Sequence, residues 1–539
     1  MLIPPRFVRT RPTSRYATLG VVVGLLLAAT PGFAQTAPGD TGLVSFSRFD
    51  PSVAAGGYDP AINAGGRYVV FVSDAANLVA GDTNGMSDIF VFDRQAGTME
   101  RVSVSSSGVQ ANDHSIEPSI SADGRYVAFE SRANNLAPDD TNFHRQSVFV
   151  RDRQSGTTEL VGARGTNENF NPSISATGRY VAFVSEPHED TPQIAVYDRE
   201  TGLLDETVSV SSAEAAGNNS SFGPSISADG RYVAFFSYAS NLVPNDTNGS
   251  RDAFVRDRVN GTTARVSLNS AEAQANGESG SVVISASGRF VAFGSAASNL
   301  VPGDTNGVDD VFVRNRQNGT TRRVSVSSGG TLANADSYAR AISPDGRYIV
   351  FVSSASNLVP NDSNGAEDVF VRDTKVGTTE RVSLGPNGRQ ANGGSIFGSI
   401  SANGRYVAFS TEARNLAVTD LNETDDVFVR ERGGTNLLLS PRALAFGNLR
   451  INTISAAKPV KVTNVSTAPV AITGVTLSGR NPGQFSRTHN CGSTLAAGAE
   501  CTVNVVFRPT SIGRKSAYLS INGGGAGLRT VELSGTGVQ

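Results

Sequence analysis

The chain of 539 residues carries 46 Lys and Arg against 49 Asp and Glu, a formal net charge of −3. The charge is uneven, because residues 437–539 hold ten basic and two acidic residues, a net of +8, and residues 35–436 have a net of −15. An acidic main segment argues against nucleic-acid binding and favours a cation or a basic partner, with an anionic surface for the basic tail. Solubility alone explains this charge pattern equally well.

Residues 1–34 predict a secretory signal peptide. Four arginines and no acidic residue precede an apolar core at residues 19–29, and small residues offer a cleavage site after Ala34. The apolar core is too short to span a bilayer, and no cysteine lies near the cleavage site to carry a lipid anchor. The mature protein is therefore expected in the periplasm or outside the cell.

Residues 35–432 repeat one short motif seven times: Gly-Arg-Tyr, once Gly-Arg-Phe, followed by an apolar run. Successive arginines of this motif are spaced by 58, 54, 52, 58, 58 and 58 residues. A fixed period of this size indicates a repeat architecture. A residue present in every repeat is explained most simply by the fold, so functional candidates must form a ring or break the pattern. The seven arginines are Arg67, Arg125, Arg179, Arg231, Arg289, Arg347 and Arg405.

Each repeat predicts four short strands. In the fifth repeat, β-branched and aromatic runs cover residues 282–285, 289–293, 310–314 and 321–326, separated by turns rich in Gly, Asn and Asp. The second and third runs are apolar at nearly every position, as expected for sheets that neighbouring sheets cover on both faces. Four strands per repeat is the content of a propeller blade.

A fourth strand follows only six of the seven repeats. The seventh repeat ends at Arg432 without one, and the missing copy lies at residues 43–47 near the start of the chain. An N-terminal strand that completes the last blade closes the ring and removes two exposed sheet edges. The sequence therefore predicts an all-β fold with a seven-bladed β-propeller over residues 35–432.

The phrase Ser/Ala-Asp-Gly-Arg-Tyr-Val-Ala-Phe, followed by Val-Phe-Val-Arg-Asp, resembles the TolB-like family of propeller repeats. The resemblance extends over residues 43–432. It implies a propeller and a mainly extracytoplasmic scaffold for protein–protein interaction, and some relatives carry an additional enzyme domain. It implies no particular activity for this chain.

After a linker at residues 433–439, a different β pattern fills residues 440–538 and predicts an immunoglobulin-like β-sandwich. The opening of this segment, residues 481–485 (Asn-Pro-Gly-Gln-Phe), the cysteine pair and the closing Leu-Ser-Gly-Thr-Gly resemble the HYDIN/ASH-type immunoglobulin-like family. This resemblance implies docking or anchoring rather than chemistry. Cys491 and Cys501 are the only cysteines, and in an exported chain they are expected to form one disulfide.

The loop between the second and third strands of most repeats carries Asp-x-Asn-Gly-x-x-Asp, a candidate calcium loop. Oxygen ligands at alternate positions, a glycine for a sharp turn and a further acid are how short loops wrap Ca²⁺. The alternative is an Asn-Gly turn whose Asp side chains cap backbone N–H groups. Repeat seven has Asp420, Asn422 and Asp426 with Glu423 in place of glycine, repeat two ends in Gln146, and repeat three lacks the motif. The complete motifs are Asp82/Asn84/Asp88, Asp246/Asn248/Asp252, Asp304/Asn306/Asp310 and Asp362/Asn364/Asp368.

Signals for an enzyme are sparse. The chain has no Gly-x-Ser-x-Gly nucleophile motif, and no hydrolase domain follows the propeller. His144 and His188 lie in the two repeats that break the loop pattern, where a histidine–carboxylate site of a polysaccharide lyase could be built; drifted surface loops are the alternative. Near the mouth of the channel we expect Asp59, Glu117 and Arg340, without an obvious acid–base pair.

The sequence therefore favours a secreted or periplasmic, non-enzymatic interaction scaffold. We expect a monomer whose propeller loops bind a protein or glycan partner and whose immunoglobulin-like tail docks it to an envelope component. Two alternatives stay open: a carbohydrate-active propeller enzyme, either a polysaccharide lyase or a glycosidase, and a calcium-stiffened structural or adhesive protein. The favoured function requires no cofactor, and Ca²⁺ is the one candidate ion.

Overall fold

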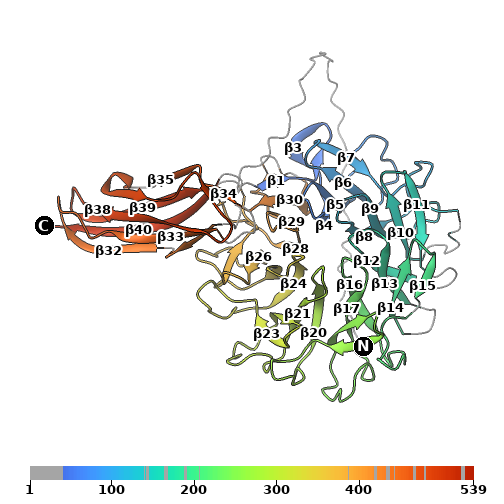
Figure 1. Ribbon diagram of the computed structural model, residues 1–539. Helices are drawn as coiled ribbons and strands as arrows, with labels where there is room; N and C mark the ends of the chain where they lie inside the picture. Colours follow the sequence, from blue (N-terminus) through green and yellow to red (C-terminus); the bar gives the residue numbers. More distant parts are fainter. Residues whose placement is uncertain are drawn as a thin grey trace, which may run out of the picture. The chain divides into compact units, whose positions relative to one another are not determined.

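The computed structural model is an all-β protein (Figure 1). It describes residues 41–138, 140, 145–162, 168–186, 191–205, 207–385, 388–417, 420, 422–432, 437–441, 443–464, 469–478, 481–523 and 528–539. The predicted signal peptide, residues 1–34, lies outside these ranges. Within them there is no α-helix, and accordingly no helix long and apolar enough to cross a membrane.

The repeats fold into four-stranded sheets, and the described residues from Thr41 to Glu431 form seven of them. The first strands are β4 (Tyr58–Ile62), β8 (Ser115–Ile120), β12 (Glu168–Ile174), β16 (Ser221–Ile226), β20 (Ser279–Ile284), β24 (Ser337–Ile342) and β28 (Ser395–Ile400). The second strands are β5 (Tyr68–Ser73), β9 (Tyr126–Ser131), β13 (Tyr180–Glu186), β17 (Tyr232–Ser237), β21 (Phe290–Ser295), β25 (Tyr348–Ser353) and β29 (Tyr406–Thr411). The third strands are β6 (Asp88–Asp93), β10 (Ser147–Asp152), β14 (Gln193–Asp198), β18 (Asp252–Asp257), β22 (Asp310–Asn315), β26 (Asp368–Asp373) and β30 (Asp426–Glu431). The fourth strands are β7 (Thr98–Arg101), β11 (Thr157–Val161), β15 (Leu203–Asp205), β19 (Thr262–Arg265), β23 (Thr320–Arg323), β27 (Thr378–Arg381) and, from the N-terminus, β1 (Thr41–Leu43).

These sheets form a propeller. The first strands contact one another in a closed series that runs from β4 through β8 to β28, and β28 contacts β4 again. Figure 1 shows the same strands around the centre of the ring. β1 pairs with β30, with Thr41 opposite Arg430 and Leu43 opposite Phe428. The N-terminal strand therefore completes the last sheet as predicted, and it begins two residues before the predicted range of 43–47. A small sheet of β2 (Phe46–Ser47) and β3 (Asp50–Ala54) follows it.

The second and third strands form the core because neighbouring sheets cover both of their faces. In six of the sheets one phenylalanine of the second strand faces one of the third, as Phe351 faces Phe370 at 5.5 Å between ring centroids. Both rings are fully buried. An aromatic pair of this kind supplies a large apolar area to each blade and explains the nearly continuous apolar sequence of these strands.

The Gly-Arg-Tyr motif joins each blade to the next. Gly288 has φ +71°, and a Cβ atom added there would overlap the ring of Tyr232 in the preceding blade. Arg316, from the same blade as Gly288, covers this ring at 4.6 Å from its centroid and donates to the Gly288 carbonyl at 2.7 Å. On the ring's other side, Arg231 lies 4.8 Å from the centroid. The contact recurs around the ring, ending with Gly66 against Tyr406.

Six of the seven motif arginines form ion pairs with acidic residues of their own blade. They therefore do not form a ring of unpaired positive charge. Arg231 pairs with Asp257 at the end of the third strand at 2.7 Å. Two donor nitrogens likewise join each of five other motif arginines to the acidic last residue of its third strand, and Arg289 instead donates to Asn315 at 3.2 Å. These arginines therefore belong to the fold, as expected for a residue present in every repeat.

The C-terminal segment is a sandwich of two four-stranded sheets. One sheet contains β31 (Leu437–Ser440), β33 (Lys458–Asn464), β38 (Glu500–Phe507) and β36 (Phe485–His489). The other contains β32 (Ala443–Arg450), β40 (Leu528–Val538), β39 (Gly513–Asn522) and β35 (Gly474–Ser478). Short elements complete it: β34 (Val470–Ala471), β37 (Thr494–Leu495) and the 3₁₀ turn η2 (Pro482–Gln484). The predicted disulfide between Cys491 and Cys501 is present.

We expect Gly288→Ala to lower the free energy of unfolding by about 2–4 kcal/mol, because the new methyl group adds backbone strain and overlaps Tyr232. The matched control is Gly307→Ala, which has φ +68° and no atom within 4 Å of the added Cβ. The control loses only the strain energy, about 1 kcal/mol. Urea unfolding of residues 35–539 measures both variants, and equal losses would contradict the blade-to-blade role of this glycine.

Candidate functional site

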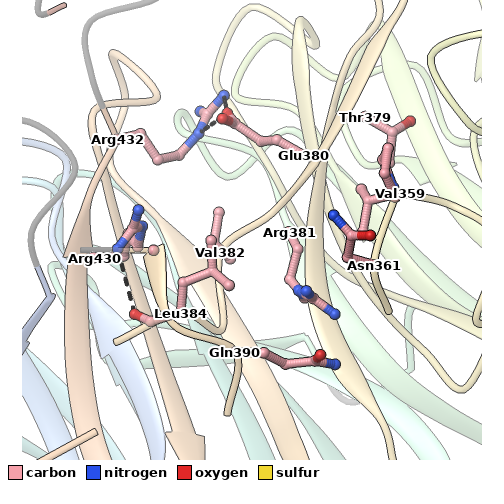
Figure 2. Close-up of a pocket in the computed structure, with 12 residues that line it drawn as sticks. Val359, Asn361, Thr379, Glu380, Arg381, Val382, Leu384, Gln390, Arg430 and Arg432 are labelled. Atoms are coloured by element: carbon pink, nitrogen blue, oxygen red, sulfur yellow. Dashed lines mark hydrogen bonds and ion pairs between the residues drawn. The ribbon is translucent and has the colours of Figure 1, made fainter. Parts of the chain in front are cut away.

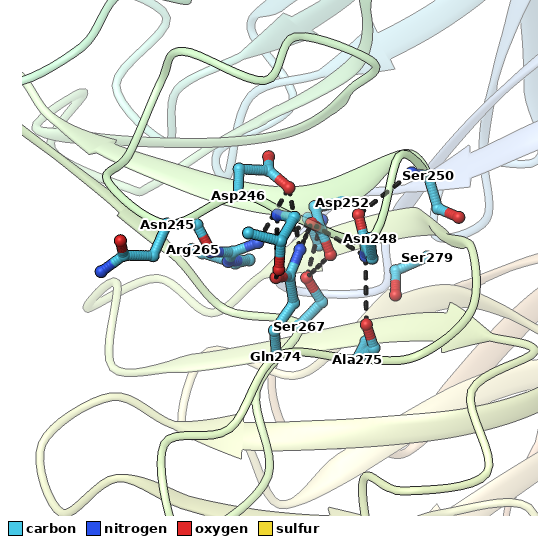
Figure 3. A network of polar contacts seen from close by, with 12 residues as sticks. Asn245, Asp246, Asn248, Ser250, Asp252, Arg265, Ser267, Gln274, Ala275 and Ser279 are labelled. Atoms are coloured by element: carbon cyan, nitrogen blue, oxygen red, sulfur yellow. Dashed lines mark hydrogen bonds and ion pairs between the residues drawn. The ribbon is translucent and has the colours of Figure 1, made fainter.

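The Asp-x-Asn-Gly-x-x-Asp loop of blade four folds around an arginine of the following strand (Figure 3). Nη1 of Arg265 lies 3.2 Å from Oδ1 of Asp246 and 2.9 Å from Oδ2 of Asp252. The side-chain amide of Gln274 donates to the same two carboxylates at 2.8 and 3.0 Å. The two acids predicted from the sequence are therefore brought together, and a guanidinium neutralises them.

The asparagine of the motif shapes the turn. Asn248 accepts a hydrogen bond from the backbone N–H of Ser250 and donates to the carbonyl of Ala275, both at 3.0 Å. Asp252 is fully buried and accepts from the hydroxyl of Ser267 at 2.5 Å. These contacts are the local capping bonds of the turn interpretation, in which side chains satisfy backbone groups.

The motif asparagines of the other three complete loops make the same donor contacts. Asn84, Asn306 and Asn364 donate to the carbonyls of Ala111, Ala333 and Ala391 at 2.9, 3.0 and 3.2 Å. Each also donates to the last aspartate of its motif, at 2.9 Å for Asn84 and Asn306 and 3.5 Å for Asn364. In all four loops the asparagine therefore directs an N–H group at the aspartate, which fits the turn interpretation, and the calcium-ligand role of these asparagines stays a prediction. An amide N–H group stabilises a carboxylate but cannot ligate Ca²⁺.

The same pairing of acids with an arginine recurs in the four blades that have the complete motif. In each blade the last residue of the fourth strand is an arginine that lies between the two carboxylates, at N–O distances of 2.9–3.3 Å. A guanidinium therefore occupies the position that a cation would take between the predicted oxygen ligands. The other three sets are Arg101 with Asp82 and Asp88, Arg323 with Asp304 and Asp310, and Arg381 with Asp362 and Asp368.

Reasoning from the loop motif alone missed this arginine, because it lies on the next strand, 13 residues beyond the last aspartate. A signal was available within the chain: blade two has Leu160 at the arginine's position opposite Phe149, and it lacks the aspartate. The register places Ser147 at the aspartate's position, not Gln146 as predicted from the sequence. Among the residues that the structure describes, no group of three or more His, Cys, Asp or Glu side chains could hold a metal ion. Calcium binding by these loops stays a prediction.

Blade seven keeps both aspartates but has Leu43 at the arginine's position, opposite Phe428. Asp426 is fully buried, and its Oδ1 accepts from the hydroxyl of Ser45 at 2.8 Å and from the N–H of Gly56 at 2.9 Å. No cationic side chain in the described ranges compensates its charge, and burial raises the pKa of Asp426 to about 6. The carboxyl group that holds the N-terminal strand in the last blade therefore titrates close to neutral pH.

Each first strand carries an irregularity, which lies at the same place in six blades and one residue later in blade six, and the residue type there differs from blade to blade. The pairing with the second strand shifts register there. Six of these residues have φ between 49° and 60°, a conformation that side chains other than glycine adopt at a cost. The bulge ring consists of these six residues and Arg340, which lies one position later in its strand and has no positive φ: Asp59, Glu117, Asn171, Gly223, Ser281, Arg340 and Phe397.

The bulge ring brings residues of different blades together. Asn171 donates to the carboxylate of Glu117 at 2.9 Å, and the guanidinium of Arg340 lies 5.7 Å from the ring centroid of Phe397. Burial, and next the nearby carboxylate of Glu117, raise the pKa of Asp59 well above its usual range, against the opposing charge of Arg340. Two neighbouring carboxyl groups that resist ionising together can bind a cationic group or share a proton.

Further carboxylates lie at the strand ends that the long loops join. Asp309 precedes β22 beside Asp336, and Asp425 precedes β30 beside Glu412; burial raises the pKa of Asp309 and Asp425, and the neighbouring carboxylate adds to it. The same two causes raise the pKa of Glu186, which lies near Glu168. We call this set the loop-face carboxylates: Glu168, Glu186, Asp309, Asp336, Glu412 and Asp425. Like charges this close together favour a positively charged ligand.

Grooves on the outer part of the propeller recur between blades. One groove of 570 Å³ lies between β27 and β30, where Arg432 donates to Glu380 at 2.6 Å (Figure 2). A groove of 820 Å³ occupies the same place between blades four and five, where Arg314 pairs with Glu272 at 2.7 Å. These grooves recur at equivalent positions of the repeat, and their arginines Arg432 and Arg314 are paired with acids. We therefore interpret the grooves as a consequence of the fold and not as ligand sites.

His144 and His188, the candidates for a lyase site, lie outside the described residues. Asp59, Glu117 and Arg340 do belong together, as the bulge ring shows. The sequence predicted these three at the channel but not the left-handed backbone at Asp59 and Glu117. A proline follows the bulge residue in four blades, and because a residue before proline favours extended backbone, this pattern did not predict the left-handed conformation. These prolines are Pro60, Pro118, Pro172 and Pro224.

Comparison with known proteins finds a family model that matches the tail and solved structures that resemble the chain. The sequence model of the ASH family (Abnormal spindle-like microcephaly-assoc'd, ASPM-SPD-2-Hydin) matches residues 435–529. The structures similar to the chain include TolB from Acinetobacter baumannii, at 16% identity and a TM-score of 0.36, with 60% of this chain and 62% of that chain covered. The chain therefore spans less than two thirds of that TolB. No curated protein shows significant similarity to the chain.

Two other similar structures are known. An oligogalacturonate lyase from Vibrio parahaemolyticus shows 12% identity and a TM-score of 0.43, with 73% of this chain and 98% of that chain covered. A protein described as TolB from Agrobacterium tumefaciens shows 16% identity and a TM-score of 0.34, with 54% of this chain and 87% of that chain covered. At these identities and TM-scores the likeness carries no information on activity.

We expect Arg265→Met to destabilise the protein by about 3–5 kcal/mol at pH 7, because Asp246 and Asp252 are left facing each other without a cation. The control is Leu43→Met at the corresponding position of blade seven, with a loss below about 1.5 kcal/mol. Urea unfolding measures both variants.

We also expect the wild type to have the same unfolding midpoint in EDTA and in millimolar Ca²⁺. A rise of the midpoint that is specific to Ca²⁺ would favour the calcium interpretation of the loops instead.

We expect Asp426→Asn to change how stability depends on pH. The unfolded carboxyl group ionises near 3.8 and the folded one near 6, so the folded state holds the proton between these values. The wild type therefore loses about 3 kcal/mol through this group as the pH rises from 4 to 7. The variant cannot ionise, so its stability relative to the wild type should rise over this window. A constant difference from pH 4 to 7 would contradict the shifted pKa.

Proposed function

We propose that the protein is a secreted or periplasmic, non-enzymatic interaction scaffold whose propeller binds a positively charged segment of a partner protein. The observation that carries the proposal is the bulge ring, where the residue type differs from blade to blade and five residues other than glycine have a positive φ. Strain of this kind persists where the surrounding structure holds it for a function. The loop-face carboxylates around it supply the matching negative charge.

The repeated charges support a scaffold because the fold already uses them. Motif arginines pair with acids at the ends of the third strands, and loop aspartates pair with arginines of the fourth strands. At Asp59, Glu186, Asp309 and Asp425, burial first and then a neighbouring carboxylate raise the pKa. A negative surface around the centre of the ring would steer a basic ligand toward it and set its specificity.

The disulfide between Cys491 and Cys501 is in keeping with export. The tail, which matches the ASH family, would dock the scaffold to an envelope component. Calcium is not needed for the four complete loops in this proposal, since an arginine already neutralises each pair of carboxylates.

One observation favours a second candidate function, a carbohydrate-active propeller. Asp59 and Glu117 form a carboxyl pair of raised proton affinity near Arg340, and a proton-sharing pair beside a guanidinium could act on an acidic sugar. Turnover of oligogalacturonate that Asp59→Asn abolishes would favour the enzyme and overturn the scaffold. We expect no turnover by the wild type.

The binding proposal is tested with an arginine- and lysine-rich peptide and residues 35–539. Replacing Asp309 and Asp336 with Asn and Glu412 with Gln should weaken binding roughly tenfold, since three interacting charges are removed. Binding should also weaken at high salt. Fluorescence anisotropy of a labelled peptide measures the dissociation constant.

The control removes the same charge elsewhere, through Asp123→Asn, Asp229→Asn and Asp345→Asn. These three acids cap the turn before the motif arginine, and Asn403 makes the same bonds in blade seven, so the fold tolerates asparagine there. We expect the control to bind the peptide like the wild type. Equal weakening by both triple variants would mean attraction to net charge only and would contradict a site on the loop face.

A further inference from the structure

Two loops at one end of the tail sandwich are tied together by backbone hydrogen bonds. The N–H of Asn452 donates to the carbonyl of Pro509 at 2.7 Å, and the N–H of Ser455 donates to that of Phe507 at 2.9 Å. We call residues 450–455 and 508–514 the tip loops. Both are well-defined connections between strands, since the first leaves β32 and the second enters β39.

Each tip loop exposes an isoleucine. Ile454 is 63% exposed and Ile512 is 57% exposed. A single exposed aliphatic residue is ordinary on a protein surface. Two on adjoining loops are notable because, in the described part of the sandwich, the other large aliphatic side chains are buried or half-buried, with Val460, Val503 and Leu519 fully buried.

The tip loops are also strongly basic. Arg450, Arg508 and Arg514 are all exposed, and the structure shows no ion pair for any of them among its described residues. Neither tip loop contains an acidic residue. Elsewhere in the sandwich, by contrast, Lys461 is neutralised by Glu500 at 2.8 Å. The two tip loops therefore carry three exposed guanidinium groups, without an ion pair in the described part of the chain, together with the two exposed isoleucines.

The position of the tip loops within the sandwich leaves them free of the chain that enters it. β31 begins at Leu437, which pairs with Asn464 at one end of β33. The tip loops lie at the other end, where Lys458 begins β33 and Val538 ends β40 opposite Arg450. Figure 1 shows the C-terminus at this end of the sandwich.

We propose that the tip loops dock the tail on a lipid surface that carries anionic phosphate headgroups. Ile454 and Ile512 enter the boundary between headgroups and acyl chains, and Arg450, Arg508 and Arg514 contact the phosphates. Exposed aliphatic side chains on loops that also carry arginines suit such a surface, because burial of apolar area and attraction to anionic lipid both contribute to the binding free energy. The inference rests on the docking role proposed for the tail and names the chemistry of what it docks to.

The test uses residues 35–539 and vesicles of phosphatidylcholine with about 30% phosphatidylglycerol, a composition at which charge attraction should dominate. We expect co-flotation with these vesicles and none with pure phosphatidylcholine. Ile454→Ser with Ile512→Ser, and separately Arg508→Gln with Arg514→Gln, should each lower the bound fraction at least tenfold. Unchanged thermal unfolding shows that these exposed substitutions leave the fold intact.

Matched controls remove similar groups elsewhere. Val259→Ser removes a side chain that is 71% exposed in the propeller, and Lys461→Gln removes a basic residue that is already neutralised. Both should bind vesicles like the wild type. Equal binding to neutral and anionic vesicles, no binding at all, or equal loss in the controls would overturn the proposal, as would binding of the tip to an acidic protein but not to vesicles. Binding of the basic peptide is measured separately, so the two proposals fail independently.

Discussion

The contact on which the propeller depends is the overlap of a tyrosine ring with the glycine of the next blade. Gly288 has no side chain, so the Tyr232 ring can lie directly on its backbone, and Arg316 then covers the ring and binds the Gly288 carbonyl. Any larger residue would push two blades apart. Because the contact recurs around the ring and closes at Gly66 and Tyr406, one displaced blade would disturb the closure that β1 completes.

This repeated packing also decides where chemistry is available. Arginines and acids at repeated positions neutralise one another, as Arg231 does with Asp257 and Arg265 with two loop aspartates. Blade seven is the exception, since its last strand comes from the N-terminus and brings Leu43 in place of the arginine. The cost is a buried carboxyl group, Asp426, that resists ionisation. Differences between blades are therefore more informative about a binding site than the repeated residues are. The bulge ring is a position where the residue type differs between blades.

Much of the fold could be predicted from the sequence, because the repeat period and the alternation of apolar runs with turn residues encode it. The Gly-Arg-Tyr spacing predicted the blades, the absent fourth strand predicted closure by the N-terminus, and two cysteines predicted the disulfide. The candidate site followed less well. The arginine that faces the loop aspartates is adjacent only in space, and the left-handed backbone at Asp59 and Glu117 follows from a register shift that residue types alone do not encode. Local motifs reveal turns, whereas a site assembled from several blades requires the packed structure.

Both surfaces that we connect with binding lie where the backbone leaves its regular ladder. In the propeller this is the bulge of the first strands, and in the tail it is the pair of loops that carry Ile454 and Ile512. Most side chains of the regular strands pack against neighbouring blades or the opposite sheet, so few of them are available to contact a ligand. The two surfaces also carry opposite charge, as the uneven charge along the sequence requires. Since salt screens charges beyond about 10 Å, ionic strength weakens both interactions together, and only substitutions at one surface can separate them.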